Sequence, residues 1–223
     1  MKKQFFVIGG IVFAVLALGI LLFNMEPQAD QNTPKLADAG KLVRDDSYSL
    51  GNKDSKAVLV EFLDFQCEAC RAAYPVTKRV LAEYGDKVRF VQRYFPLPGH
   101  KNGKIAAQAA AAAGEQGKYW EMQEKLFENQ EIWGSDQRAV SQSQAFEIFK
   151  GYARELSLDE AKFTESVKSE KFMDVIKRDI ADGEALNVNS TPTFFLNGEM
   201  LRGVPRYEEL KGKIDKLLGE ATQ

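Results

Sequence analysis

Hydrophobic positions divide this chain into an unbroken apolar segment, a polar stretch and a longer part in which the period of the apolar residues changes. The apolar segment, residues 5–23, carries no charged side chain and, at about 1.5 Å per residue of helix, is long enough to cross a bilayer. Lys2 and Lys3 precede it, and acidic residues follow it. Because basic residues favour the cytoplasmic side, the pattern predicts a single-pass anchor in the cell membrane, with the rest of the chain extracytoplasmic.

The alternative to a retained anchor is a cleaved signal peptide, whose apolar region is usually shorter and ends near a small-x-small site. No such site follows residue 23 closely, and Ala37-Asp38-Ala39, which has the pattern, lies far downstream. We therefore expect an anchor over residues 1–24. Residues 25–42 are rich in Gln, Asp, Asn and Pro, which predicts a flexible tether before a folded domain over residues 43–223.

Three segments at the start of this domain predict a βαβ unit. Residues 57–65 are almost continuously apolar and rich in β-branched and aromatic side chains, which is typical of a strand covered on both faces. Residues 67–84 follow with helical spacing, and residues 87–94 have the composition of a second strand. A strand, a crossover helix and a strand in this order predict two parallel strands with a right-handed connection.

The pattern from residue 102 to about residue 180 is almost entirely helical and predicts a multi-helix insert. After the insert, residues 193–202 predict a hairpin with Asn197-Gly198 at its turn, a dipeptide that suits positive φ. Residues 207–218 predict a closing amphipathic helix. The order βαβ, helices, ββα places the domain in the α/β class.

Charge and composition narrow the possible functions. The formal net charge is -2, so no long-range field favours nucleic acid as a partner. The chain has one histidine, His100, and two cysteines, Cys67 and Cys70, too few for a closed zinc site, and we expect no metal or other cofactor. His100 lies in a turn-rich loop over residues 95–100, which we expect at the surface, with a place beside the functional site as the alternative.

Cys67 and Cys70 carry the candidate chemistry. Cys67 follows a predicted strand and opens a predicted helix, where free N–H groups and the helix dipole favour a thiolate and should lower its pKa. Cys70 lies one turn later and can reach the same sulfur. Attack by one thiol and resolution by the other gives a two-electron couple that needs no cofactor.

Two further positions bear on this pair. Glu61 is the only charge in the middle of the first strand, where burial should raise the pKa of its carboxyl group and suit it to proton transfer; a structural pairing with a lysine is the alternative. Pro192 directly precedes a strand, and the residues alone favour an ordinary trans proline at a strand start.

The run Phe62-Leu63-Asp64-Phe65-Gln66-Cys67-Glu68-Ala69-Cys70, the distant Ser190-Thr191-Pro192-Thr193-Phe194 and the βαβ–ββα order resemble the thioredoxin superfamily. The helical insert resembles the DsbA-like thiol–disulfide oxidoreductases, especially their membrane-anchored members. The resemblance implies a thioredoxin fold with an insertion between its two halves, preceded by one N-terminal transmembrane helix.

For the site, the resemblance implies that Cys67 is the exposed nucleophile and Cys70 the buried, resolving thiol. It further implies that Glu61 is the family's buried acid, that Pro192 is cis and faces the pair, and that Thr191 lines the substrate groove. The best-known oxidase of that family has Pro-His between its cysteines, whereas this chain has Glu68-Ala69. Because a carboxylate beside Cys67 disfavours the thiolate, we expect a weaker oxidant.

The expected function is therefore the formation of disulfides in extracytoplasmic proteins, with protein substrates and a membrane redox partner that reoxidises the cysteine pair. A reductase or isomerase with the opposite electron flow uses the same residues and is the second hypothesis. The third is an anchored peptide-binding chaperone in which Cys67 and Cys70 form a static disulfide. A metal site shared with a second chain is the weakest alternative.

Overall fold

The computed structural model describes residues 36–135, 140–201 and 203–219. The expected anchor at residues 5–23 lies outside these ranges, and no helix within them is long and apolar enough to cross a membrane. The expected tether overlaps the described part only from Leu36 onward. There the chain forms the short helix α2 (Ala39–Leu42) with Leu42 buried, so a folded segment lies within the residues expected to form the tether.

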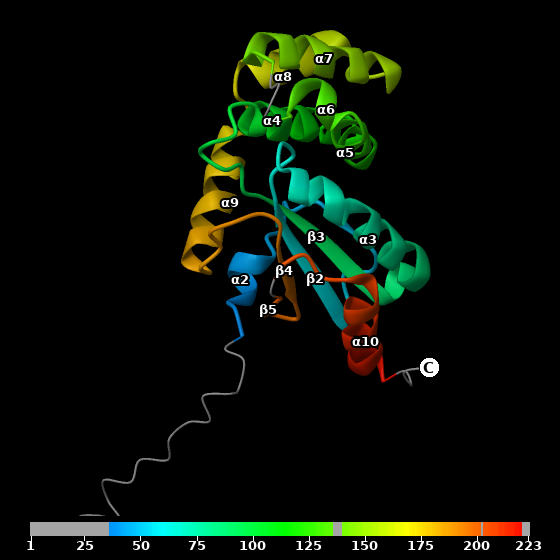
Figure 1. Ribbon diagram of the computed structural model, residues 1–223. Helices are drawn as coiled ribbons and strands as arrows, with labels where there is room; N and C mark the ends of the chain where they lie inside the picture. The colour runs from blue at the N-terminus through cyan, green and yellow to red at the C-terminus, as the bar shows by residue number, and fades with distance from the viewer. Residues whose placement is uncertain (1–35, 136–139, 202, 220–223) are drawn as a thin grey trace, which may run out of the picture. The chain divides into compact units, whose positions relative to one another are not determined.

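Five strands form one mixed sheet in the order β1–β3–β2–β4–β5 (Figure 1). The central strand β2 runs parallel to β3, as the βαβ pattern predicts, and it pairs antiparallel with β4. The strands are β1 (Ser49–Leu50), β2 (Ala57–Leu63), β3 (Val88–Tyr94), β4 (Thr193–Leu196) and β5 (Glu199–Leu201). The short edge strand β1, which pairs antiparallel with β3, is an addition that the sequence pattern did not indicate.

Helices cover both faces of this sheet, which explains the continuous apolar run of β2. Leu59 packs in a cluster with side chains of α3 (Glu68–Tyr84) and α10 (Tyr207–Leu218). Its neighbours Val60 and Phe62 point to the opposite face, into a cluster that includes Leu42 of α2. Because successive side chains of a strand point to opposite faces, both sets must be apolar.

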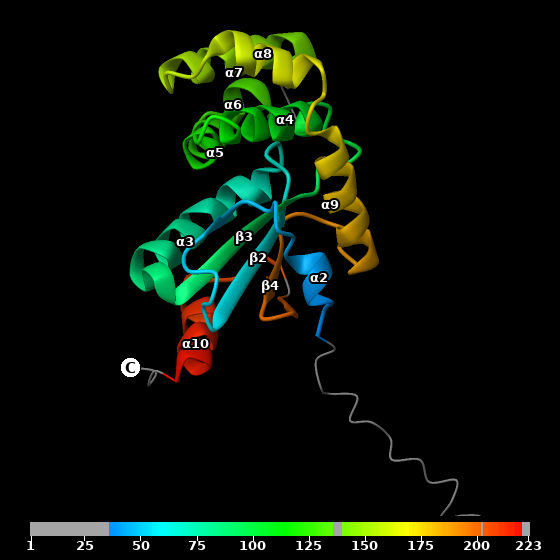
Figure 2. The same ribbon diagram turned by 180° about the vertical axis from the view of Figure 1, so that it is seen from behind.

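The helical insert forms a separate layer at one end of the sheet (Figures 1 and 2). Its helices are α4 (Gly103–Gly114), α5 (Tyr119–Glu128), α6 (Gln130–Trp133), α7 (Gln142–Glu155) and α8 (Glu160–Lys168), and α9 (Met173–Ala185) leads back to the sheet. The alanines of α4 are buried, so small side chains let neighbouring helices approach closely. Trp133 is fully buried against Phe149, at a ring-centroid distance of 5.0 Å.

The hairpin that closes the sheet has the expected turn. Asn197 and Gly198 both have positive φ, 47° and 86°, and lie between β4 and β5. The Asn197 side chain also accepts a hydrogen bond from the Val58 N–H at 2.7 Å and donates one to the Lys56 carbonyl oxygen at 2.8 Å. The turn is therefore tied to the start of β2.

A buried ionic cluster ties α9 to β3 and to the start of the domain. The side chain of Arg93 is fully buried, and its Nη2 lies 2.7 Å from both Asp179 Oδ1 and Asp182 Oδ2. Asp182 also pairs with Arg44, and Arg93 donates to the Leu42 carbonyl oxygen at 3.0 Å. Two arginines thus face two buried carboxylates, and Arg93 also holds the end of α2.

Candidate active site

The cysteine pair lies at the start of α3, the crossover helix that follows the central strand β2. β2 ends at Leu63, two residues earlier than the apolar run predicts, and residues 64–66 form a loop. Cys67 is the N-cap of α3 and has extended backbone, and Cys70 lies in the first turn. Both thiols are free. Cys70 is fully buried, as expected, whereas Cys67, which was expected to be exposed, is also buried and only 8% exposed.

The Cys67 sulfur is set up as a thiolate. The pKa of its thiol is lowered to about 6, first because Cys70 donates a hydrogen bond to the sulfur. The Thr191 side chain and the backbone N–H groups of Cys70 and Ala69 lower this pKa further, whereas burial opposes them. The shift has the direction expected at a helix N-terminus, but the backbone N–H groups contribute less to it than the Cys70 hydrogen bond does.

The Cys70 thiol is shifted in the opposite direction. Burial raises its pKa well above the ordinary value, and the hydrogen bond to Cys67 and the charge of Glu61 raise it further. The backbone N–H of Asp64, which lies 3.5 Å from Cys70 Sγ, lowers it to a smaller extent. Near neutral pH, the pair therefore combines a thiolate at Cys67 with a protonated thiol at Cys70.

Glu61 is buried in the middle of β2, as its sequence position predicts. It is 2% exposed, and burial raises the pKa of its carboxyl group to about 8. Its partner across the parallel ladder is Gln92 of β3, whose Nε2 donates to Glu61 Oε2 at 3.4 Å and counteracts part of that rise. Among the described residues, the side chain that hydrogen-bonds this carboxyl group is therefore Gln92 and not a lysine.

The loop before β4 completes the site. The Thr191–Pro192 peptide bond is cis, as the family resemblance implies and as the residues alone did not indicate. The thiol of Cys67 donates a hydrogen bond to the Thr191 carbonyl oxygen at 3.2 Å. The Thr191 hydroxyl group is buried, and the Thr191 side chain contributes to the lowered pKa of the Cys67 thiol. Sequence positions about 120 residues apart thus meet at one sulfur.

The residues brought together here match a known family. A family model described as Thioredoxin matches residues 44–216, which is most of the chain. The chain belongs to the thioredoxin family.

Solved structures place this thioredoxin-family chain among DsbA-type folds. A thioredoxin-like oxidoreductase from Silicibacter pomeroyi is 26% identical, with a TM-score of 0.67, and the match covers 83% of this chain and 100% of that one. BdbD from Bacillus subtilis has a TM-score of 0.67 at 23% identity, with 83% and 97% covered. Wolbachia pipientis alpha-DsbA1 has a TM-score of 0.68 at 22% identity, with 80% and 94% covered. The resemblance to DsbA-like proteins is confirmed for the fold.

Curated relatives are much longer than this chain. The Na(+)/H(+) antiporter NhaA of Herminiimonas arsenicoxydans is 34% identical over 202 residues, which is 88% of this chain and 30% of the relative. NhaA 1 of Mycolicibacterium vanbaalenii is 35% identical over 164 residues, which is 71% of this chain and 24% of the relative. The chain therefore spans less than a third of these relatives, and a match of this extent includes much of the thioredoxin-like domain.

One pair of side chains at the site was missed from the sequence. Asp64 is 1% exposed and accepts hydrogen bonds from the backbone N–H groups of Gln66 and Leu97, both at 2.8 Å. His100 Nδ1 lies 2.6 Å from Asp64 Oδ2. The loop over residues 95–100, which was expected at the surface, therefore contacts the loop over residues 64–66 that precedes Cys67. Gly103 leaves room for this carboxylate, since a Cβ there would lie 2.7 Å from Asp64 Oδ1.

A second missed residue comes from the insert. Gln130 is buried, and its Nε2 donates to the carbonyl oxygens of Phe65 and Cys67, at 2.7 and 3.0 Å. Its neighbours in the sequence, Asn129 and Glu131, are also polar, so no pattern distinguished Gln130. Glu68 and Ala69, between the cysteines, are exposed. Within the described ranges, no group of His, Cys, Asp and Glu side chains is placed to hold a metal ion.

Proposed function

We propose that this protein is a thiol–disulfide oxidoreductase that forms disulfides in other proteins. The observation that carries the proposal is the opposite shift of the two thiol pKa values, lowered to about 6 at Cys67 and raised well above 9.0 at Cys70. A thiolate that is stabilised in the reduced protein makes Cys67 a good leaving group and makes the Cys67–Cys70 disulfide more oxidising.

In the oxidising direction, a substrate thiolate attacks Cys67 Sγ of the Cys67–Cys70 disulfide. The new bond joins substrate and Cys67, and Cys70 leaves as a thiolate that takes up one proton. A second substrate thiolate then attacks the substrate sulfur of the mixed disulfide and expels the Cys67 thiolate. The substrate loses two electrons and two protons, and the cysteine pair gains both electrons and one proton, while the other proton goes to solvent.

Glu61 is the group that we assign to this proton transfer. Its pKa of about 8 leaves the carboxyl group protonated near neutral pH, and its charge affects the Cys70 thiol. It can therefore give a proton to Cys70 when that thiolate is expelled, and regain one afterwards. Gln92, hydrogen-bonded to the same carboxyl group, orients it.

The setting of this reaction is part of the proposal. The apolar residues 5–23, with lysines before them and acidic residues after them, support a single-pass anchor and an extracytoplasmic catalytic domain. Its substrates are then reduced proteins outside the cytoplasm, and a membrane redox partner reoxidises the pair. Glu68, exposed beside Cys67, supports a lower oxidising power than that of a Pro-His oxidase.

The experiment is catalysed oxidation of a reduced test protein by the full chain. The Cys67→Ser variant should lose all catalysis, because the attacked sulfur is gone. The Cys70→Ser variant should instead trap a mixed disulfide when it is offered a protein that already holds a disulfide, because the Cys67 thiolate attacks that bond, one protein thiolate leaves, and no Cys70 thiol remains to resolve the product. Retained activity in Cys67→Ser, or a wild-type protein that binds the test protein without exchange, contradicts the proposal and favours the chaperone hypothesis.

A further inference from the structure

A groove of about 710 Å³ lies between α3 and α5, beside the cysteine pair. Its apolar surface comes from Ala72, Tyr74 and Pro75 of α3 and from Phe127 of α5. The rings of Tyr74 and Phe127 lie 5.3 Å apart between their centroids. Its size is that of a site for a ligand or a short peptide segment, and the reaction proposed above does not use it.

One end of the groove lies next to the backbone of Cys67, the residue that carries the reactive sulfur. Helix α6 makes the connection, since Gln130 Nε2 donates to the Cys67 carbonyl oxygen at 3.0 Å. The next residue, Glu131, pairs with Arg71 of the groove at 2.6 Å. Glu68, which directly follows Cys67, also lines the groove. Any polypeptide that reaches Cys67 from this side therefore meets the groove within one turn of α3.

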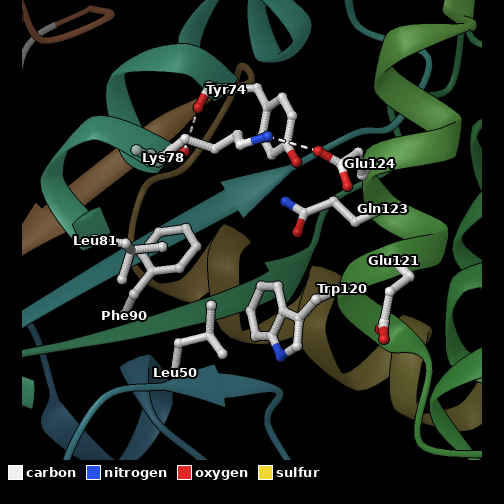
Figure 3. A pocket seen from close by; sticks show the side chains of 10 residues that line it. Leu50, Tyr74, Lys78, Leu81, Phe90, Trp120, Glu121, Gln123 and Glu124 are labelled. Atoms are coloured by element: carbon white, nitrogen blue, oxygen red, sulfur yellow. Dashed lines mark hydrogen bonds and ion pairs between the residues drawn. The ribbon is translucent and has the colours of Figure 1, made fainter. Parts of the chain in front are cut away.

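The far end is closed by an ion pair that crosses from α3 to α5. Lys78 Nζ lies 2.6 Å from Glu124 Oε1, with Tyr74 beside it, as Figure 3 shows from the adjoining pocket. Arg71 and Lys78 are seven residues apart, which is about 10 Å along a helix axis. At about 3.3 Å per extended residue, the groove accommodates about three residues of a substrate chain.

The charge that this groove presents to solvent is negative. Both of its cations are already neutralised, Arg71 by Glu131 and Lys78 by Glu124. Glu68 and Glu128 line the groove and are exposed, and neither forms an ion pair within the described part of the chain. The charge of Glu128 acts on the groove itself, because it contributes, after burial and Glu124, to raising the pKa of Tyr74.

We propose that the groove binds the substrate polypeptide next to its reactive cysteine and selects a basic side chain there. The apolar stem of an arginine or lysine lies over Tyr74 and Phe127, and its charged head reaches Glu128 and Glu68. This inference rests on the proposed function and specifies its substrates. Attraction between the acidic groove and a basic substrate side chain raises the rate of association and adds specificity. Disulfide exchange at the sulfur alone does not distinguish one substrate from another.

The test uses three short reduced peptides that differ at one position, three residues from a single cysteine, where they carry Arg, Gln or Glu. The second-order rate constant for mixed-disulfide formation with the oxidised full chain should fall in the order Arg, Gln, Glu. Because exposed ion pairs contribute modestly, we expect the Arg and Glu peptides to differ about five- to tenfold at low salt, with the difference shrinking as salt is added.

Glu128→Lys is the decisive variant, because it lies on α5, away from the cysteine pair. It should abolish or reverse the order of the peptides while leaving the reduction potential and the pH profile of Cys67 alkylation unchanged. Glu209→Lys on α10 is the matched control, since it makes the same charge change at an exposed position on another helix, and it should preserve the wild-type order.

Equal rates for the three peptides, or an unchanged order in Glu128→Lys, overturn the groove assignment while leaving the proposed function intact. Binding of the same peptides with serine in place of cysteine separates the two claims. If Arg-peptide binding depends on Glu128 but no peptide exchanges disulfides, the groove assignment stands and the proposed function fails.

Discussion

Burial separates the roles of two residues that are chemically identical and one helical turn apart. Cys67 at the helix start accepts a hydrogen bond from Cys70 and further ones from backbone N–H groups, whereas Cys70 is fully buried, and their pKa values move in opposite directions. The sequence could predict both cysteines and Glu61, because spacing and an isolated charge in an apolar strand are visible in it. It could not predict Gln92 or the Asp64–His100 contact, because these depend on which strands and loops become neighbours.

Alkylation of the reduced protein should report the pKa of Cys67 directly. The rate of reaction with a small alkylating reagent should rise with a midpoint near pH 6, because only the thiolate reacts and its pKa is lowered to about 6. Cys70 should remain unmodified over the same range, as mass spectrometry of the labelled peptides can establish. A midpoint near the ordinary value of 9.0 would contradict the assignment of Cys67 as nucleophile.

The carboxyl group of Glu61 should make stability depend on pH. Its pKa rises from the ordinary value of 4.5 to about 8 on folding, so between these values the folded state binds more protons and stability falls as pH increases. With both cysteines replaced by alanine, we expect this decline, and we expect Glu61→Gln to remove it. Urea unfolding of both variants between pH 5 and 8 measures the two slopes; parallel slopes would refute the raised pKa.

Among the elements, those with long and regular patterns were predictable and those made by tertiary contact were not. The closing helix α10 begins and ends at the residues its amphipathic pattern indicates, and the Asn197-Gly198 turn has the expected φ values. By contrast, β1 and α2 are too short to carry a pattern. The central strand stops at Leu63 because the Asp64 carboxylate accepts the Gln66 N–H and turns the chain.

The contact between α9 and β3 should depend on Arg93. Replacing it with methionine leaves Asp179 and Asp182 buried without that cation, and loss of one partner from a buried ionic cluster costs about 3–5 kcal/mol of unfolding free energy. Arg154→Met is the control, since Arg154 pairs with Glu160 at the surface and its loss should cost much less unfolding free energy. Equal losses of unfolding free energy in the two variants would show that the buried cluster contributes no more to stability than a surface ion pair does.

In the whole molecule, the two halves of a thioredoxin fold bring Cys67 and Thr191 together, and a helical layer is placed above them. Resemblance to a family was needed to expect the cis peptide bond, because the residues near Pro192 alone favour the trans form. The match of this chain to a minor part of longer antiporter relatives shows that the domain also occurs within larger proteins. The anchor at residues 5–23 stays a prediction.

The reduction potential of the Cys67–Cys70 couple tests the central claim most directly, by equilibrating the full chain with glutathione buffers of known ratio. A stabilised Cys67 thiolate makes the couple more oxidising than thioredoxin, at about −270 mV, while Glu68 keeps it below DsbA, at about −120 mV. We predict a value between these limits. A value at or below that of thioredoxin, or a pair that never exchanges with glutathione, would contradict an oxidase.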